Sequence, residues 1–226
     1  MKVLAVIPAF NEEECIEATV TELQAACPDV DYLVVNDGSK DGTQHICESR
    51  GMTIVSLPIN TGLASGFRTG MKYAWCHGYD AVVQFDADGQ HVPTYIPKMV
   101  EEMQRSNADI VIASRYLEGK KPEGARGAGS RLISGLVKLT TGTAITDPTS
   151  GMRLFNRSMI EHFAYDFDIS PEPDTMALMA RKGKKIVEVP AEMRERQGGE
   201  SYFDIPHIVG YMARMCASIV LFQWFR

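Results

Sequence analysis

The sequence predicts an α/β fold, a single domain in which helices flank a mostly parallel, Rossmann-like sheet. Short apolar segments alternate with helical segments of about 10–15 residues along the first half of the chain, which is the pattern of βαβ units. A length of 226 residues is sufficient for one substantial core. A content of 45% apolar and 23% charged residues is typical of globular proteins. Together these observations favour one α/β domain.

The first half of the chain supplies five predicted strands and the helices between them. The strands are short runs rich in Val, Ile and Leu, and they cover residues 2–7, 31–37, 52–57, 80–85 and 108–114. The helices are expected at 11–27, 39–51, 62–78 and 95–105. Asn11 is the expected N-cap of the first helix, and Gly51 and Gly78 are expected to end the second and third.

The second half of the chain has a looser pattern. Residues 117–131 are rich in Gly and in Lys or Arg, and they are predicted to form a mobile loop. A turn, a short strand and a helix start are expected within 146–158. Helices are expected over 131–140 and 170–185. Segment 185–196 is predicted to be an edge strand or a strand pair, because Pro190 cannot donate a hydrogen bond to a central ladder.

The C-terminal segment, residues 204–226, is predicted to be an apolar helix that follows a domain of residues 1–203. Only Ser218 and Gln223 interrupt the apolar run between Met215 and Phe225. Such a run of helix spans about 16 Å, far less than the ~30 Å hydrocarbon core of a bilayer, so no membrane span is expected. Two interpretations stay open: a core or dimer-forming helix in a homo-oligomer, or a helix that lies at a membrane surface.

Charge and cysteine content exclude some classes of function. The formal net charge is −6, which argues against nucleic-acid binding through overall positive charge. The five cysteines are scattered and contain no CxxC pair, which indicates free packing thiols in a reducing cytosol. The N-terminal apolar run is too short for a signal peptide and is followed by acidic residues.

Two acids follow the predicted strand 80–85 in the stretch AVVQFDADGQH. Asp86 and Asp88 are two residues apart, so in extended chain they point to the same side and repel each other. A hard divalent cation such as Mg²⁺ or Mn²⁺ would bind this pair and would also take phosphate oxygens of a ligand. The alternative is a solvated acidic turn. His91 flanks the motif and is interpreted as a bystander.

Other polar residues also stand where predicted parallel strands end, which is where ligands bind in such sheets. Asp37 could accept a hydrogen bond from a base or a ribose hydroxyl, or could belong to an ordinary Asn-Asp-Gly turn. Glu12 and its acidic neighbours could instead favour a helix N-terminus. Six arginines could hold phosphate through their planar guanidinium groups, namely Arg115, Arg126, Arg131, Arg153, Arg194 and Arg196.

Six motifs resemble the signature sequence of family 2 glycosyltransferases, which are inverting enzymes with the nucleotide-sugar-binding GT-A fold. These are VIPAFNEE (6–13), VVNDGSKDGT (34–43), NTG (60–62), FDADGQH (85–91), ASRY (113–116) and DPTSGMRLF (147–155). Their order and spacing match over about residues 1–201. Gln90, the Arg of SRY and ERQGGES (195–201) are similar to the dolichyl- or polyprenyl-phosphate sugar transferases. That branch commonly has Lys after the last Ser, where this chain has Tyr202.

The resemblance implies a role for each matching position. The nucleoside pocket would be lined by Pro8, Ala9, Asn11, Glu12 and Asp37, with Gly62 allowing close backbone approach. The metal and the diphosphate would be held by Asp86, Asp88 and Gln90. Phosphate of the donor or the acceptor would be held by Arg115, Arg131, Arg196 and Ser201. Glu172 and Asp174 stand where many family members carry an acceptor-side acid.

The expected function is therefore a metal-dependent, inverting transfer of sugar from a UDP- or GDP-linked donor to polyprenyl phosphate, of undecaprenyl or dolichyl type, for cell-surface glycan synthesis. The expected location is cytoplasmic, at the inner face of a membrane, through the C-terminal helix or a small membrane protein. Asp88, Asp174, Glu172 and Arg131 are the candidate catalytic residues.

Two alternatives stay open. A saccharide hydroxyl acceptor would need Asp174 or Glu172 as general base. A non-catalytic subunit would bind the sugar nucleotide without turnover. A nucleotidyltransferase is disfavoured, because it would want a Gly-rich basic loop where this chain has FNEEE.

Overall fold

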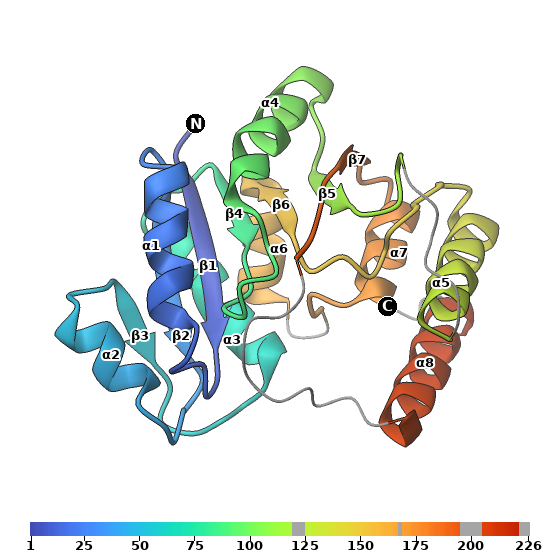
Figure 1. Ribbon diagram of the computed structural model, residues 1–226. Helices are drawn as coiled ribbons and strands as arrows, with labels where there is room; N and C mark the ends of the chain where they lie inside the picture. The colour runs from blue at the N-terminus through green and yellow to red at the C-terminus, as the bar shows by residue number, and fades with distance from the viewer. Residues whose placement is uncertain (119–124, 167–168, 195–204, 222–226) are drawn as a thin grey trace.

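A seven-stranded sheet in the order β3-β2-β1-β4-β6-β5-β7 forms the centre of the molecule (Figure 1). The structure is a computed structural model, and it describes residues 1–118, 125–166, 169–194 and 205–221. The strands are β1 (Val3–Ala9), β2 (Asp31–Asn36), β3 (Ile54–Ser56), β4 (Ala81–Gln84), β5 (Ile110–Ser114), β6 (Arg153–Asn156) and β7 (Ile186–Pro190). All pairs are parallel except those of β6, which is antiparallel to β4 and β5. The predicted α/β class is confirmed.

Helices cover both faces of the sheet, as Figure 1 shows. They are α1 (Ile16–Ala26), α2 (Thr43–Ser49), α3 (Leu63–Cys76), α4 (Ile96–Ser106), α5 (Ala125–Thr141), α6 (Arg157–Tyr165), α7 (Pro173–Arg181) and α8 (Ile205–Val220). Alternate residues of β1 enter two separate cores: Leu4 and Val6 pack with α3 and α6, whereas Ala5 and Ile7 pack with α1 and α4. Burial on both faces explains why β1 is a continuous apolar run rather than an alternating one.

The reversed direction of β6 determines which loops meet. The carboxyl ends of β1, β2, β4 and β5 lie at one edge of the sheet because these strands share a direction. Since β6 runs the opposite way, its amino end lies at that same edge. The segment 147–152, which precedes β6, is thereby delivered to the loops that follow β4 and β5.

The first helix begins later than predicted. Asn11 has φ 55° and is not an N-cap, because α1 begins at Ile16 with Cys15 at its N-cap position. The Asn11 side chain is instead used across loops, where its Oδ1 accepts from the Lys40 N–H at 2.9 Å. The Asn11 N–H donates to Ser39 Oγ at 3.0 Å. The capping prediction was wrong because a partner distant in sequence binds this side chain.

Helix α5 begins at Ala125, so the predicted loop 117–131 is wrong from that residue onward. Its buried Ile133 and Val137 join the core. A Cβ at Gly129 would lie 3.1 Å from the Cε of Met212, a residue of α8. Packing of α5 against the core and α8 therefore accompanies helix formation despite the low helix propensity of its glycines.

The predicted edge strand and C-terminal helix are both present. β7 ends the strand order, as Pro190 suggested. α8 packs against α5 and α7 and buries Met215 and Ile219. Among the described residues, no helix combines the length and the apolar character that crossing a bilayer requires.

Substituting Gly70 with Ala tests the close approach of α3 to β1. A Cβ at Gly70 would lie 2.2 Å from Cγ1 and 2.7 Å from Cγ2 of Val6, in a site that is fully packed. Urea denaturation should show that Gly70→Ala lowers the free energy of unfolding by about 1–3 kcal/mol, the usual effect of overpacking. Val6→Ala should lower the free energy of unfolding less in the Gly70→Ala protein than in the unsubstituted protein, because it removes the two methyl groups that the new Cβ meets.

Gly135→Ala is the control, because nothing lies within 4 Å of a Cβ built at that position. Equal stability of the Gly70 and Gly135 variants would contradict the prediction.

Candidate active site at the carboxyl edge of the sheet

Asp37 organises the loop that precedes α3. Its side chain is buried, and Oδ1 accepts from the N–H and the hydroxyl of Thr61 at 2.9 and 2.8 Å. Its Oδ2 accepts from the Gly62 N–H at 2.7 Å. Gly62 has φ +89° and nothing within 4 Å of a would-be Cβ, so the backbone conformation and not crowding favours glycine there. Asp37 thus accepts hydrogen bonds from two main-chain N–H groups and one hydroxyl. Its contact with a nucleoside stays a prediction.

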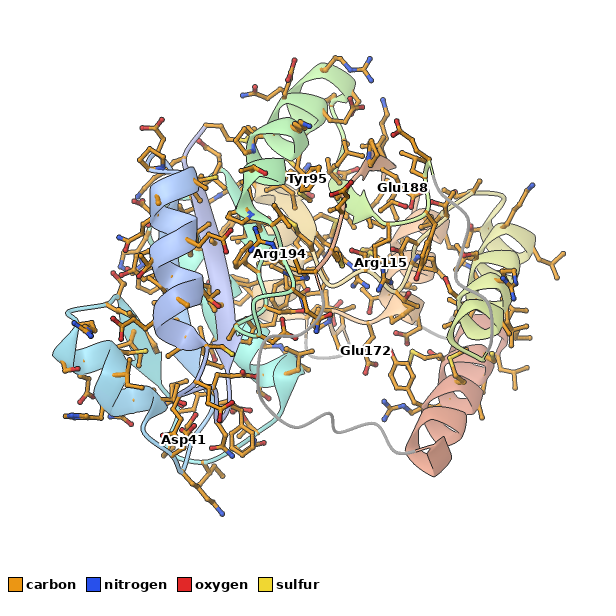
Figure 2. The ribbon with its side chains drawn as sticks, in the orientation of Figure 1. Asp41, Tyr95, Arg115, Glu172, Glu188 and Arg194 are labelled. Atoms are coloured by element: carbon orange, nitrogen blue, oxygen red, sulfur yellow. The ribbon has the colours of Figure 1, made fainter. Side chains whose placement is uncertain are left out.

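The loops after β1 and β2 are joined by hydrogen bonds. The Glu12 N–H donates to Thr43 Oγ1 at 2.9 Å, and the same hydroxyl donates to Asp41 Oδ1 at 2.6 Å. Partial burial acts to raise the pKa of Asp41, but hydrogen bonds from Thr43 and Glu13 outweigh it and hold that pKa below its usual value. Figure 2 labels Asp41 at this end of the sheet. Of the predicted nucleoside-pocket residues, Ala9 is buried, Pro8 is half-buried and Asn11 is exposed.

The three predicted metal ligands lie in one turn after β4. Asp88 is 9% exposed, and its two oxygens accept from the N–H and the side-chain amide of Gln90 at 3.1 and 2.6 Å. With its amide nitrogen on Asp88, Gln90 can offer a cation only its carbonyl oxygen. The Asp86 side chain is 35% exposed, and its Oδ2 lies 3.5 Å from the Nε2 of His91.

This donor set fits Mg²⁺ or Mn²⁺. It consists of carboxylate and amide oxygens, which hard divalent cations prefer. In the described part of the chain, no three or more His, Cys, Asp or Glu side chains are grouped to hold a metal ion by themselves. Mg²⁺ is usually bound by one or two carboxylates with waters and substrate phosphates completing the shell, so a two-carboxylate turn is a suitable half-site.

Arg115 is held by a buried polar network that the sequence motifs did not indicate. Its Nε and Nη2 donate to the two oxygens of Asp147 at 2.7 and 2.8 Å, and Nη2 also donates to Thr149 Oγ1 at 2.9 Å. Asp147 is fully buried, and its N–H donates to Glu188 Oε1 at 2.9 Å. Burial lowers the pKa of Arg115, but the hydrogen bonds and charge of Asp147 more than offset this effect. Figure 2 labels Arg115 and Glu188.

The described arginines of the predicted phosphate-binding cluster have different partners. Arg153 is fully buried, where it donates to the carbonyls of Pro171 and Pro148 at 2.9 Å each, and burial lowers its pKa to about 10. Arg194 forms a bidentate pair with Glu22 at 2.8 Å. The Arg153 guanidinium thus supports main-chain carbonyls, and its contact with phosphate stays a prediction.

The remaining predicted phosphate contacts are placed as follows. Arg131 is exposed on α5. Arg196 and Ser201 lie outside the described residues, and so their roles stay predictions.

The two candidate acceptor-side acids lie under α8. Asp174 is 5% exposed, and its Oδ2 accepts from the Ser218 hydroxyl at 2.6 Å. Glu172, labelled in Figure 2, contacts the Arg214 guanidinium at 3.3 Å. Burial, and then the charge of Glu172, raise the pKa of the nearby Tyr211 to about 12. In this arrangement Asp174 is engaged inside a helix–helix contact.

Comparisons with known proteins bear on the site as a whole. The model of the family described as Glycosyl transferase family 2 matches residues 4–163. The chain is 34% identical to the undecaprenyl-phosphate mannosyltransferase of Micrococcus luteus, over 89% of this chain and 87% of that protein. It is 29% identical to the polyprenol monophosphomannose synthase of Mycolicibacterium smegmatis, over 88% and 80% of the two chains.

A solved structure shares the fold. The glucosyl-3-phosphoglycerate synthase of Mycobacterium tuberculosis, in complex with Mn²⁺, uridine-diphosphate and phosphoglyceric acid, matches with a TM-score of 0.72. The match covers 98% of this chain and 78% of that chain at 19% identity.

Removing Asp147 tests the network around Arg115. Among the described residues, Asp147→Ala leaves the Arg115 side chain with one hydrogen bond, to Thr149, so urea denaturation should show a fall of about 3 kcal/mol in the free energy of unfolding. This is the lower end of the range for a broken buried pair, because Arg115 stays partly exposed.

Glu102→Ala is the matched control. It breaks the surface pair with Arg105 at 2.8 Å and should cost less than about 1 kcal/mol. Similar losses in the two variants would show that the Arg115 network contributes no more than a surface ion pair.

Proposed function

The chain belongs to glycosyl transferase family 2 and is a glycosyltransferase, and from this premise we propose that it is a metal-dependent, inverting enzyme that transfers a sugar from a nucleoside diphosphate donor to polyprenyl phosphate. Mannose is the first candidate sugar, because it occurs in the names of similar relatives. The observation that carries the proposal is the turn after β4. Within five residues, Asp86, Asp88 and Gln90 provide side-chain oxygen atoms that could coordinate a cation, at the edge where such sheets bind ligands.

Different residues at this edge of the sheet would bind different parts of the donor and the acceptor. A cation held by Asp86 and Asp88 would neutralise the charge that develops on the departing diphosphate. The segment 60–62, fixed by Asp37, would border the nucleoside. The network of Asp147 and Glu188 holds Arg115 at the end of β5, where its guanidinium would lie beside phosphate.

The contacts of the acceptor-side acids support phosphate over a saccharide hydroxyl as acceptor. A hydroxyl must lose a proton in the reaction and so requires an accessible general base. Asp174 is buried against Ser218, and Glu172 is paired with Arg214. A phosphate acceptor is already an anion and requires positioning rather than a base.

A transfer assay tests the proposal. The protein is incubated with Mn²⁺ or Mg²⁺, labelled UDP- and GDP-sugars, and undecaprenyl or dolichyl phosphate. Label should enter the organic phase, and EDTA should prevent this. Asp88→Asn should lower the rate at least about 100-fold, because it removes a charged ligand of the cation.

The controls separate the alternatives. Asp29→Asn, at an exposed acid remote from the acidic turn in sequence, should keep full activity. Label that enters only water-soluble saccharide would support the hydroxyl acceptor. Donor binding without turnover on any acceptor would support a non-catalytic subunit. Full activity in EDTA or with Asp88→Asn would overturn metal dependence.

The outer surface of α5 and α8 supports peripheral contact with the inner face of a membrane. These helices lie side by side at one end of the molecule (Figure 1). Neither helix contains an acidic residue, although the chain carries a net charge of −6. On α5, Leu132 and Leu139 are 51% and 82% exposed, beside the exposed Arg131 and Lys138. Apolar side chains flanked by cations suit an interface with anionic lipid.

Vesicle flotation tests the membrane surface. Leu132→Gln with Leu139→Gln should weaken binding to vesicles that contain anionic lipid by about tenfold or more, because two apolar side chains no longer enter the interface. Ile59→Gln is the control, since Ile59 is 66% exposed in the loop between β3 and α3, away from α5 in sequence. Unchanged flotation of the double variant would favour attachment through a small membrane protein. A shift in gel filtration would instead indicate a dimer contact.

A further inference from the structure

His91 is buried against both the main chain and the side chain of Asp86. It is 3% exposed, and its Nδ1 accepts from the Asp86 N–H at 3.0 Å. In the neutral ring the proton is therefore on Nε2. That nitrogen lies 3.5 Å from Asp86 Oδ2, an electrostatic contact longer than a hydrogen bond. The Phe85 ring packs edge-on against the imidazole, with centroids 5.4 Å apart. The ring is thus fixed with its N–H toward the carboxylate.

Gly151 closes the other side of this carboxylate. A Cβ built on it would lie 2.6 Å from Asp86 Oδ2 and 3.2 Å from His91 Nε2. Gly151 does not have a positive φ, so its backbone conformation does not require glycine. The preceding residue is anchored, because the buried Ser150 hydroxyl donates to the Ala113 carbonyl at 2.6 Å. The main chain at Gly151 is therefore held in place, and it packs directly against the Asp86 carboxylate.

We propose that Gly151 and His91 are positioning residues that hold the Asp86 carboxylate in the orientation required to bind the divalent cation. This inference rests on the proposed metal-dependent function. A ligand fixed before the cation arrives loses less conformational freedom on binding. Outer residues that orient a ligand in this way typically change metal affinity about 10–100-fold when they are substituted. Neither residue touches the cation itself, and each acts through Asp86.

Gly151→Ala is the most direct test. The added methyl group would overlap most with the end of the Asp86 side chain, at 2.6 Å, and less with the His91 ring, at 3.2 Å. The carboxylate can turn away, so we expect the fold to accommodate the substitution while the orientation of Asp86 changes. We expect Mn²⁺ affinity in the presence of UDP or GDP, measured by electron paramagnetic resonance, to fall about tenfold or more, with little change in the urea midpoint. Gly135→Ala is the matched control, because its Cβ meets nothing within 4 Å. Transfer activity of Gly151→Ala should recover as the Mn²⁺ concentration is raised.

Two substitutions of His91 separate its two contacts. His91→Asn keeps a polar atom near the position of Nδ1, which can accept from the Asp86 N–H, but loses the N–H that faces the carboxylate. His91→Gln can place its amide N–H near the position of Nε2 but loses the acceptor. We expect His91→Asn to weaken Mn²⁺ binding about tenfold, and His91→Gln to keep Mn²⁺ affinity within about threefold while becoming less stable to urea.

The outcomes distinguish this inference from the proposed function. If the unsubstituted protein binds no Mn²⁺ with either nucleotide, the metal-dependent function fails and the inference fails with it. If that protein binds Mn²⁺ and both Gly151→Ala and His91→Asn bind it as tightly as Gly135→Ala does, the function stands and the inference is overturned. Should Gly151→Ala fail to fold, the comparison of the two His91 variants decides.

Discussion

Two carboxylates, Asp86 and Asp88, stand in one short turn at the carboxyl edge of the sheet, and like charges so close together repel each other. The Asp88 charge is met by two N–H donors of Gln90. Asp86 lies 3.5 Å from His91 and makes a marginal contact with Gln84, the charge of the buried Arg153 also acts on it, and it stays partly exposed. The partly exposed Asp86 carboxylate therefore gives the turn a negative charge on its open side. A bound divalent cation would offset this repulsion and could at the same time take phosphate oxygens of a donor.

The sheet topology supplies the rest of the site. Parallel strands bring the loops after β1, β2, β4 and β5 to one edge, and the antiparallel β6 returns the segment 147–152 to the same edge. One residue of that segment, Asp147, then holds Arg115, while another, Gly151, borders Asp86. A single reversed strand thus links the acidic turn to the arginine. Glu188, on the edge strand β7, fixes this segment through Thr146 and Asp147.

The helix pair α5 and α8 packs against α7, which begins beside the two acids proposed for the acceptor side. α8 covers the start of α7, where Ser218 engages Asp174 and Arg214 engages Glu172. A neighbouring helix therefore contacts both acids for which the family resemblance implies a catalytic role, which agrees with an acceptor that needs no base. The same two helices carry exposed leucines and cations on a chain of net negative charge. Acceptor chemistry and membrane contact are thus proposed for adjacent surfaces.

The sequence by itself determined the features that depend on residues close together in the chain. Runs such as Val3–Ala9 are apolar because both faces of the strand are buried, and that pattern is local. Asp86, Asp88 and Gln90 lie within five residues, so their shared turn was also visible. The tertiary structure alone decided which distant groups meet. Asn11 binds Ser39 and Lys40, Asp174 binds Ser218, and Gly151 rests against Asp86, although these partners lie tens of residues apart. Such contacts depend on strand order and helix packing, which arise from burial of the whole core and leave no local periodicity in the sequence.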